Sequence, residues 1–421
     1  MNKDFTLISW AKNAVLYEVN IRQFTPEGTF SAFQKHLSRI KKMGVDILWL
    51  MPITPISSIK RQGSLGSYYA CSSYTKINEE FGNLDDFKLF VKEAHQLGLK
   101  VIIDWVANHT GCDHEWTKNH PDFYQQDAEG NFTERNGWKD VVDLNFENSE
   151  MQKALIEAMQ FWVKECDIDG FRCDMAHLVP LTFWKDARTN CDALKMLFWL
   201  AECDDEKYLE VFDVNYAWSW MHLTEKLIKH EIKMNDLISN LTLYLSYPKE
   251  KLKLFFTSNH DENSWNGTEF EKYGITAKAF TVLAFTYLGK PLIYSGQEIP
   301  NQKRLAFFEK DNLDWNNGIK LENFYSKLSS IHKIILNEEA NFEFLPSNQN
   351  QSILSFLKKS NTELLLIILN LSKLDKVNFK INHTLISGTF LNLFSEMIYQ
   401  FKEVENFELM AGDYLVFRKL K

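Results

Sequence analysis

Residues 151–174 read MQKALIEAMQFWVKECDIDGFRCD. The first part, residues 151–166, is typical of a helix, and residues 170–173 form a short apolar run that predicts a buried strand. The strand ends at a carboxylate, Asp174. Repeated units of a strand and a helix favour parallel strands joined by right-handed crossovers.

The same unit recurs on both sides of this stretch. About eight strand candidates precede residue 300, which suits a (β/α)₈ TIM barrel of ~250 residues, larger with insertions. The other predicted strands are 15–19, 47–51, 100–105, 198–201, 212–214, 254–258 and 291–295, and the other predicted helices are 30–43, 81–97, 181–188 and 274–288.

Two regions depart from this rhythm and predict further domains. Residues 109–148 follow the third strand without a clear period, and a loop of that length is usually functional or a small inserted domain. Residues 338–421 contain short alternating runs, which predict a C-terminal antiparallel β domain, a β-sandwich. The barrel itself is then assigned to residues 1–108 and 149–337.

The bulk composition excludes several classes of function. A net charge of -9 over 421 residues argues against a nucleic-acid partner, because phosphate binding needs clustered Lys and Arg. No apolar run is long enough to cross a bilayer, and the six cysteines lack zinc-site spacing. No secretion signal is visible at the start, so we expect a cytoplasmic protein that needs no membrane. The oligomeric state is left open.

Polar residues follow four of the predicted strands. Catalytic groups of barrel enzymes stand at the carboxyl ends of strands. Three of these ends supply a carboxylate, Asp174, Glu202 and Asp261, where a charge is costly unless it is paired or functional. Arg172 lies two residues before Asp174, so both side chains point to the same side of the strand.

Convergent carboxylates suit the hydrolysis of glycosidic bonds. One carboxylic acid protonates the leaving oxygen, and a second carboxylate either attacks the anomeric carbon or activates water against it. A neighbouring guanidinium, here Arg172, holds a carboxylate ionised and aims it. The acid needs a raised pKa, which burial or adjacent negative charge supplies.

Seven segments together resemble the α-amylase family, glycoside hydrolase family 13. They occur in the order of the family's own motifs, from about residue 14 to residue 298, and the ordered set is specific where any one segment is weak. The segments are GSYYACSSYTKINEEFG (66–82), DWVANH (104–109), VDLN (142–145), GFRCD (170–174), LAE (200–202), SNHDEN (258–263) and GKPLIYSGQE (289–298).

The resemblance implies a role for each matching residue. Asp174 would be the nucleophile, Glu202 the general acid and then the base, and Asp261 the group that stabilises the distorted sugar ring. Six further residues would contact or organise the sugar: Arg172 orienting Asp174, Tyr69 stacking on the ring, His109 and His260 binding its hydroxyls, His177 on the leaving-group side, and Asp104, more structural than catalytic.

The chain also departs from the family's calcium-dependent members. Their nucleophile is usually followed, at the third and fourth positions, by Lys and His, whereas His177 and Leu178 stand here. Asn108 matches a calcium-ligand Asn, which leaves calcium open, but we expect no required cofactor. The short insertion is similar to that of oligosaccharide-acting members such as cyclomaltodextrinases.

The expected activity is therefore retaining hydrolysis of α-glucosidic bonds, α-1,4 first, in starch-derived glucans or maltooligosaccharides. A transglycosylase of the same fold is the alternative, because another sugar can replace water. A non-catalytic carbohydrate-binding homologue ranks lower, since such proteins typically lose one or more of the three carboxylates and all three are present here. Product analysis separates these possibilities.

Overall fold

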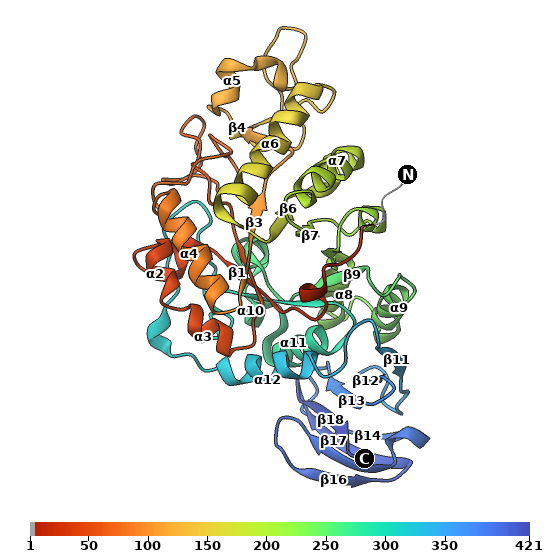
Figure 1. The fold of residues 1–421 in the computed structure, drawn as a ribbon. Coiled ribbons are helices and arrows are strands. Elements are labelled where there is room, and N and C mark those ends of the chain that lie inside the picture. Colours follow the sequence, from red (N-terminus) through yellow and green to blue (C-terminus); the bar gives the residue numbers. More distant parts are fainter. Residues whose placement is uncertain (1–4) are drawn as a thin grey trace.

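The computed structural model describes residues 5–421; residues 1–4, which open the predicted barrel segment, lie outside it. Eight parallel strands close into a barrel in the order β1-β10-β9-β8-β7-β6-β3-β2, as the TIM-barrel prediction requires (Figure 1). Their bounds are β1 (Leu16–Val19), β2 (Ile47–Leu50), β3 (Lys100–Trp105), β6 (Gly170–Cys173), β7 (Phe198–Ala201), β8 (Val214–Tyr216), β9 (Leu252–Phe255) and β10 (Lys290–Tyr294).

The register of three neighbouring strands places the polar motifs side by side. Parallel pairing sets Asp104 of β3 opposite Arg172 of β6, and Cys173 of β6 opposite Ala201 of β7. The next residues, Asp174 and Glu202, therefore leave the barrel at the same level. Gly170 permits this approach, because a Cβ there would lie 2.1 Å from the carbonyl oxygen of Phe198.

Helices pack around the outside of the barrel. The 18-residue helix α6 begins after Asn148, whose side chain accepts hydrogen bonds from the backbone N–H groups of Glu150 and Met151. The helices are α1 (Ile21–Phe24), α2 (Phe30–Gln34), α3 (Leu37–Lys42), α4 (Leu84–Gln96), α5 (Glu115–Asn119), α6 (Ser149–Cys166), α7 (Leu181–Asp192), α8 (Trp218–Ile228), α9 (Met234–Leu245), α10 (Glu269–Tyr273), α11 (Ala277–Thr286) and α12 (Glu322–His332). Over residues 5–421, no helix combines the length and apolar character needed to cross a bilayer.

The single helix expected over residues 30–43 is wrong. Two short helices, α2 and α3, stand in its place, because the backbone N–H of His36 bonds back to the Phe33 carbonyl at 2.8 Å and tightens the turn. The His36 ring then packs against Phe24 and Trp315, with ring centroids 5.1 and 5.8 Å away. A periodic apolar pattern does not reveal such a break.

Residues between β3 and α6 form the outgrowth at the top of Figure 1. A short antiparallel pair, β4 (His109–Gly111) and β5 (Val141–Asp143), anchors this outgrowth on the barrel, with His109 opposite Asp143. Helix α5 lies between the two strands in the sequence. The outgrowth therefore begins and ends at the mouth of the barrel.

The C-terminal region lies at the end of the molecule opposite this outgrowth, below α11 and α12 (Figure 1). It has a six-stranded sheet in the order β11-β12-β13-β18-β15-β16 and a separate pair, β14-β17, all antiparallel. Some of its apolar side chains form a core of their own, and others, such as Phe356 and Leu369, join the main core. The strands are β11 (Asn341–Phe344), β12 (Ile353–Lys359), β13 (Leu364–Asn370), β14 (Lys376–Asn382), β15 (Gly388–Asn392), β16 (Ile398–Phe401), β17 (Val404–Met410) and β18 (Tyr414–Lys419).

Candidate active site

One buried guanidinium gathers the carboxylates at the carboxyl end of the barrel. Nη1 of Arg172 donates to Oδ1 of Asp104 and to Oδ1 of Asp174, both at 2.9 Å. Its Nη2 lies 2.8 Å from Oε2 of Glu202, an ion pair without hydrogen-bond alignment. Nε donates to the hydroxyl of Tyr216 at 3.1 Å. Two predicted catalytic carboxylates therefore share one cation.

Burial and crowding make these carboxylates weak acids. Burial raises the pKa of Glu202 to about 7; Arg172 opposes this shift, and the negative charges of Asp174 and Asp261 add to it. Burial likewise raises the pKa of Asp174 to about 6, against Arg172 and with Asp104. Both shifts favour the protonated form, and a raised pKa is what the acid of a glycosidase pair needs.

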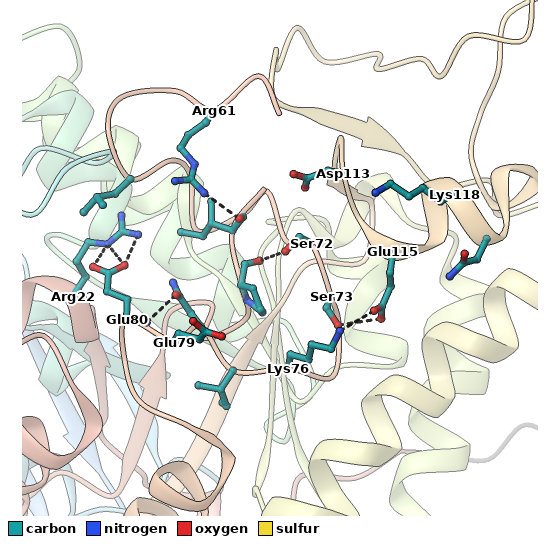
Figure 2. Close-up of a pocket in the computed structure, with 16 residues that line it drawn as sticks. Arg22, Arg61, Ser72, Ser73, Lys76, Glu79, Glu80, Asp113, Glu115 and Lys118 are labelled. Atoms are coloured by element: carbon teal, nitrogen blue, oxygen red, sulfur yellow. Dashed lines mark hydrogen bonds and ion pairs between the residues drawn. The ribbon is translucent and has the colours of Figure 1, made fainter. Parts of the chain in front are cut away.

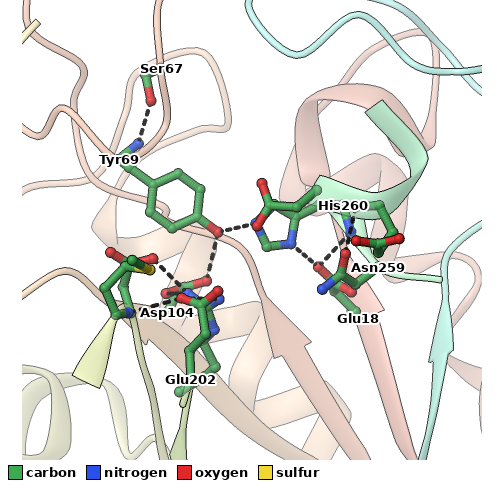
Figure 3. A network of polar contacts seen from close by, with 12 residues as sticks. Glu18, Ser67, Tyr69, Asp104, Glu202, Asn259 and His260 are labelled. Atoms are coloured by element: carbon green, nitrogen blue, oxygen red, sulfur yellow. Dashed lines mark hydrogen bonds and ion pairs between the residues drawn. The ribbon is translucent and has the colours of Figure 1, made fainter. Parts of the chain in front are cut away.

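A second network runs behind Tyr69 (Figure 3). The Tyr69 hydroxyl donates to Oδ2 of Asp104 at 3.1 Å and lies 2.7 Å from Nε2 of His260. Nδ1 of His260 lies 2.5 Å from Oε1 of Glu18, a fully buried residue of β1, and Nε2 lies 3.3 Å from Oδ2 of Asp261. This chain of contacts joins both sides of the barrel mouth.

The histidine in this network is charged at neutral pH. Burial opposes a charge on His260, but the carboxylates of Asp261 and Glu18 outweigh burial and raise the pKa to about 9. His109 differs, because burial lowers its pKa to about 4 and leaves the ring neutral. Of the two predicted sugar-binding histidines, His260 is thus charged and His109 is neutral.

A cavity of about 270 Å³ opens above the two networks. Five of the residues singled out in the sequence line it: Tyr69, His109, Asp174, Glu202 and Asp261. The rest of the lining is Gln62, Ser67, Trp138, Asp140, Val141, Met175, Trp265, Phe307 and Phe308. The cavity therefore combines acidic groups with aromatic rings, the composition expected of a sugar site.

The remaining predicted residues lie outside this lining. Arg172, Asp104 and His260 are buried directly behind it. His177 is exposed on a short turn of 3₁₀ helix, and its carbonyl oxygen accepts from the Tyr208 hydroxyl at 3.2 Å. His177 is therefore not among the residues that line the cavity.

Comparison with known proteins identifies the family. The sequence profile described as the alpha-amylase catalytic domain matches residues 16–139 and 123–333, which together span most of the chain. The chain belongs to the α-amylase family of glycoside hydrolases. The segments quoted from the sequence fall within this match.

Solved structures extend the similarity to the whole fold. A maltogenic α-amylase from Thermotoga neapolitana superposes with a TM-score of 0.88 at 29% identity, covering 98% of this chain and 100% of that one. An α-amylase from Lactobacillus plantarum gives 0.89 at 28% identity with the same coverage. Among curated proteins, an α-amylase from Haloarcula japonica is 24% identical over 86% of this chain. The chain spans only 34 to 64% of the length of the first four curated relatives.

Several lining residues were not found by sequence reasoning about the family motifs. Trp138 comes from the outgrowth, its ring centroid 5.0 Å from His109. Trp265 sits in a π-helical turn, Glu262–Asn266, and Phe307 and Phe308 sit in the segment after β10. All four lie in segments without a regular apolar period, so the sequence does not show which of their side chains point inward. Tyr216 is a residue of β8, and its hydroxyl accepts the hydrogen bond from Nε of Arg172.

Some of the oxygen atoms near Asn108 are already occupied by the protein's own groups. Calcium requires about six to eight oxygen ligands. Oδ1 of Asn108 is buried without a partner, but the neighbouring carboxylate of Asp143 is already paired with Nε of Arg135 at 2.8 Å. Within residues 5–421, no group of three His, Cys, Asp or Glu side chains could hold a metal ion.

A larger cavity of about 640 Å³ lies outside the barrel mouth, beside α5 (Figure 2). Its charged groups satisfy one another: Arg22 pairs with Glu80 at 2.9 Å, and Lys76 pairs with Glu115 at 3.2 Å. Asp113 accepts from the backbone and hydroxyl of Ser58. These charged groups of the lining therefore already have partners on the protein itself.

Proposed function

We propose that this chain is a retaining hydrolase of α-glucosidic bonds, α-1,4 first, in starch-derived glucans or maltooligosaccharides. The observation that carries the proposal is the pairing of Asp174 and Glu202 on one guanidinium, with pKa values of about 6 and 7, at the floor of a cavity. A shared cation keeps the two groups close, in keeping with the ~5–5.5 Å separation of retaining enzymes.

The two carboxylates divide the work in the first step. Glu202 gives its proton to the glycosidic oxygen, and the bond between that oxygen and C1 breaks. Asp174, ionised and aimed by Arg172, forms a bond to C1 and gives a covalent glucosyl-enzyme. The leaving sugar departs as an alcohol.

In the second step, ionised Glu202 takes a proton from water, whose oxygen attacks C1. The ester bond to Asp174 breaks, and both carboxylates return to their starting states. The product keeps the α configuration, because two inversions cancel.

Neighbouring groups would hold the sugar through both steps. Asp261 accepts hydrogen bonds from ring hydroxyls, and charged His260 behind it holds Tyr69 and Asp261 in place. Tyr69, fixed by Asp104 and His260, presents its ring to the apolar face of the sugar. Neutral His109 completes the opposite wall.

No calcium is required in this proposal, because Arg135 supplies the positive charge beside Asp143. Activity and Tm that stay unchanged in EDTA would support this, and loss of either would contradict it.

The test is the product profile from a maltooligosaccharide series, with pullulan and sucrose in parallel and Asp174→Asn as control. Shorter α-anomeric products from the wild type alone support the proposal. Longer products point to the transglycosylase, and binding without turnover points to a carbohydrate-binding homologue. Maltotriose from pullulan indicates cleavage of its α-1,6 bonds, whereas panose or isopanose indicates cleavage of its α-1,4 bonds.

A further inference from the structure

Two loops that line the candidate cleft also contact each other. The first, residues 57–66, follows β2, and the second, residues 303–311, follows β10. The backbone N–H of Ser64 donates to Oε1 of Glu309 at 2.9 Å, and the Ser64 hydroxyl donates to Oε2. The backbone N–H of Leu65 donates to the Phe308 carbonyl at 3.0 Å. We call these contacts among Ser64, Leu65, Phe308 and Glu309 the tie.

At the tie, the backbone of the first loop packs directly against side chains of the second loop. Gly63 adopts a φ of +61°, and a Cβ there would lie 2.6 Å from both Cβ of Phe308 and Oε1 of Glu309. Only glycine fits this close approach without strain. The two loops are therefore in van der Waals contact as well as hydrogen-bonded.

The first loop is braced from outside. Arg61 folds back along it, its Nε donating to the Ser57 carbonyl at 3.0 Å and its Nη2 to the Ile56 carbonyl at 3.3 Å (Figure 2). Asp113 of the outgrowth accepts from the Ser58 backbone and hydroxyl at 2.9 and 2.6 Å. The loop is thus held from two sides before it reaches the tie.

The second loop is braced in the same manner. The backbone N–H of Leu305 donates to Oδ1 of Asn263 at 2.9 Å, and Gln23 donates to the Ala306 carbonyl at 2.8 Å. Asn312, just beyond the loop, donates to the Thr25 carbonyl at 2.6 Å. These bonds attach the second loop to segments that follow β1 and β9.

Ring contacts show the side of the cleft on which the tie lies. Tyr69 lies nearly parallel to Phe307 with centroids 6.2 Å apart, and Phe307 is 5.5 Å from Trp265 and 5.2 Å from Phe308. The order of contacts runs from Tyr69 through Phe307 to Phe308 and the tie. Glu202, by contrast, lies on Arg172 and accepts from the Met175 backbone.

The chemistry of the first step determines in which direction each end of the bound glucan extends from the attacked sugar. The proton donor faces the leaving oxygen, so the part of the glucan released first extends past Glu202. The sugars joined to the 4-hydroxyl of the attacked unit extend the opposite way, past Tyr69 toward Phe307. That direction leads to the non-reducing end of the chain, and the ring contacts of Phe307 and Phe308 lead along it to the tie.

We propose that the tie makes the cleft blind on its non-reducing side, so that the enzyme takes chain ends and releases short products from them. This inference rests on the proposed function. The cavity of about 270 Å³ lies just below the ~300–1,000 Å³ range of ligand pockets, which suits a site that holds few sugar units. Phe307 and Trp265 form the end wall, and Trp265 is 52% exposed before a sugar covers it.

The test compares two nitrophenyl maltoheptaosides, one with a free non-reducing end and one whose terminal 4- and 6-hydroxyls carry an ethylidene cap. We expect kcat/KM for the capped substrate to be lower by roughly 100-fold. Equal cleavage of both would overturn the blind cleft and leave the proposed hydrolase intact. Cleavage of neither would instead contradict the proposed function itself.

A double variant tests the tie directly. Ser64→Ala with Glu309→Ala removes the side-chain bonds of the tie, and neither residue lines the cavity. We expect the kcat/KM for the capped substrate to rise by roughly tenfold, with little change for the free-ended substrate. No rise, in a variant with wild-type Tm, would show that the tie is not the barrier.

The test of the double variant includes a matched control and an alternative variant. Asp127→Ala removes another exposed carboxylate that accepts from backbone N–H groups, but those groups lie in its own loop, at Glu129 and Asn131. It should leave the ratio of capped to free cleavage unchanged. If the double variant fails to fold, Phe308→Ala provides the alternative, and it should also raise the ratio.

Discussion

Two buried arginine clusters in this barrel contain similar groups and differ in what surrounds them. Arg172 and Arg188 are both fully buried, and each pairs with buried carboxylates. Strand β7 touches both clusters, because its residue Trp199 bonds to the Arg188 group and Glu202, directly after the strand, pairs with Arg172. The two clusters can therefore be compared within one frame.

The Arg188 cluster is closed and balanced by hydrogen bonds. Arg188 pairs with Asp192 at 3.2 Å and with Asp213 at 2.9 Å. Every oxygen of these two carboxylates accepts a bond, the others coming from the backbone of Leu197 and from the backbone and ring N–H of Trp199. A fully satisfied network of this kind holds α7 against the barrel.

The Arg172 cluster carries excess negative charge and faces a cavity. Asp104, Asp174 and Glu202 share one guanidinium. Charged His260 is shared by Asp261 and Glu18, and one oxygen of Glu18 has no partner. A buried arginine paired with carboxylates therefore does not by itself identify an active site. An excess of carboxylates over cations beside an open cavity does identify one.

The largest expected effect comes from Asp174→Asn. The carboxamide is nearly isosteric but cannot form the glucosyl-enzyme, so kcat should fall by roughly four orders of magnitude or more. The fold holds the pKa of Asp174 at about 6, above its ordinary value, so the charged form is disfavoured in the folded state at pH 7. Removing the charge should therefore preserve or raise Tm, measured by calorimetry beside the activity assay.

Glu202→Gln should follow in size. Loss of the proton donor should lower kcat on unactivated maltooligosaccharides by roughly 10²- to 10⁴-fold. Formation of the glucosyl-enzyme from glucosides with good leaving groups should be far less affected, because these need no protonation. Equal loss on both kinds of substrate would remove Glu202 from the acid role.

Arg188→Met should give the opposite pattern. It leaves Asp192 and Asp213 buried without their cation, which costs about 3–5 kcal/mol of unfolding free energy, measured by urea denaturation. Activity per folded molecule should stay near the wild type at low temperature. A variant that folds stably but loses turnover would mean that the two clusters are not separable.

These contrasts show how far the sequence could predict the molecule. The barrel and the three carboxylates could be predicted, because buried strands and the residues that end them leave a local pattern. The predicted strand 212–214 is wrong by two residues, since β8 begins at Val214 and Asp213 instead serves the Arg188 cluster. Glu18 and Phe307 could not be predicted, because only the closed barrel brings them to His260 and Tyr69.

The smallest expected effect is the pH dependence of kcat/KM. Asp174 must be ionised, so activity should fall as the pH drops through about 6. Glu202 must be protonated, so activity should also fall as the pH rises through about 7. A pH series on one maltooligosaccharide should give a narrow bell. A plateau extending well above pH 8 would contradict the acid assignment.

The most direct test of the account is to trap the covalent intermediate. Incubation with 5-fluoro-α-glucosyl fluoride, whose fluorine slows breakdown of the glucosyl-enzyme, should add one fluoroglucosyl group per chain. Peptide mass spectrometry should place that group on Asp174. Labelling of another carboxylate, or a β-anomeric first product by NMR, would contradict retention through Asp174.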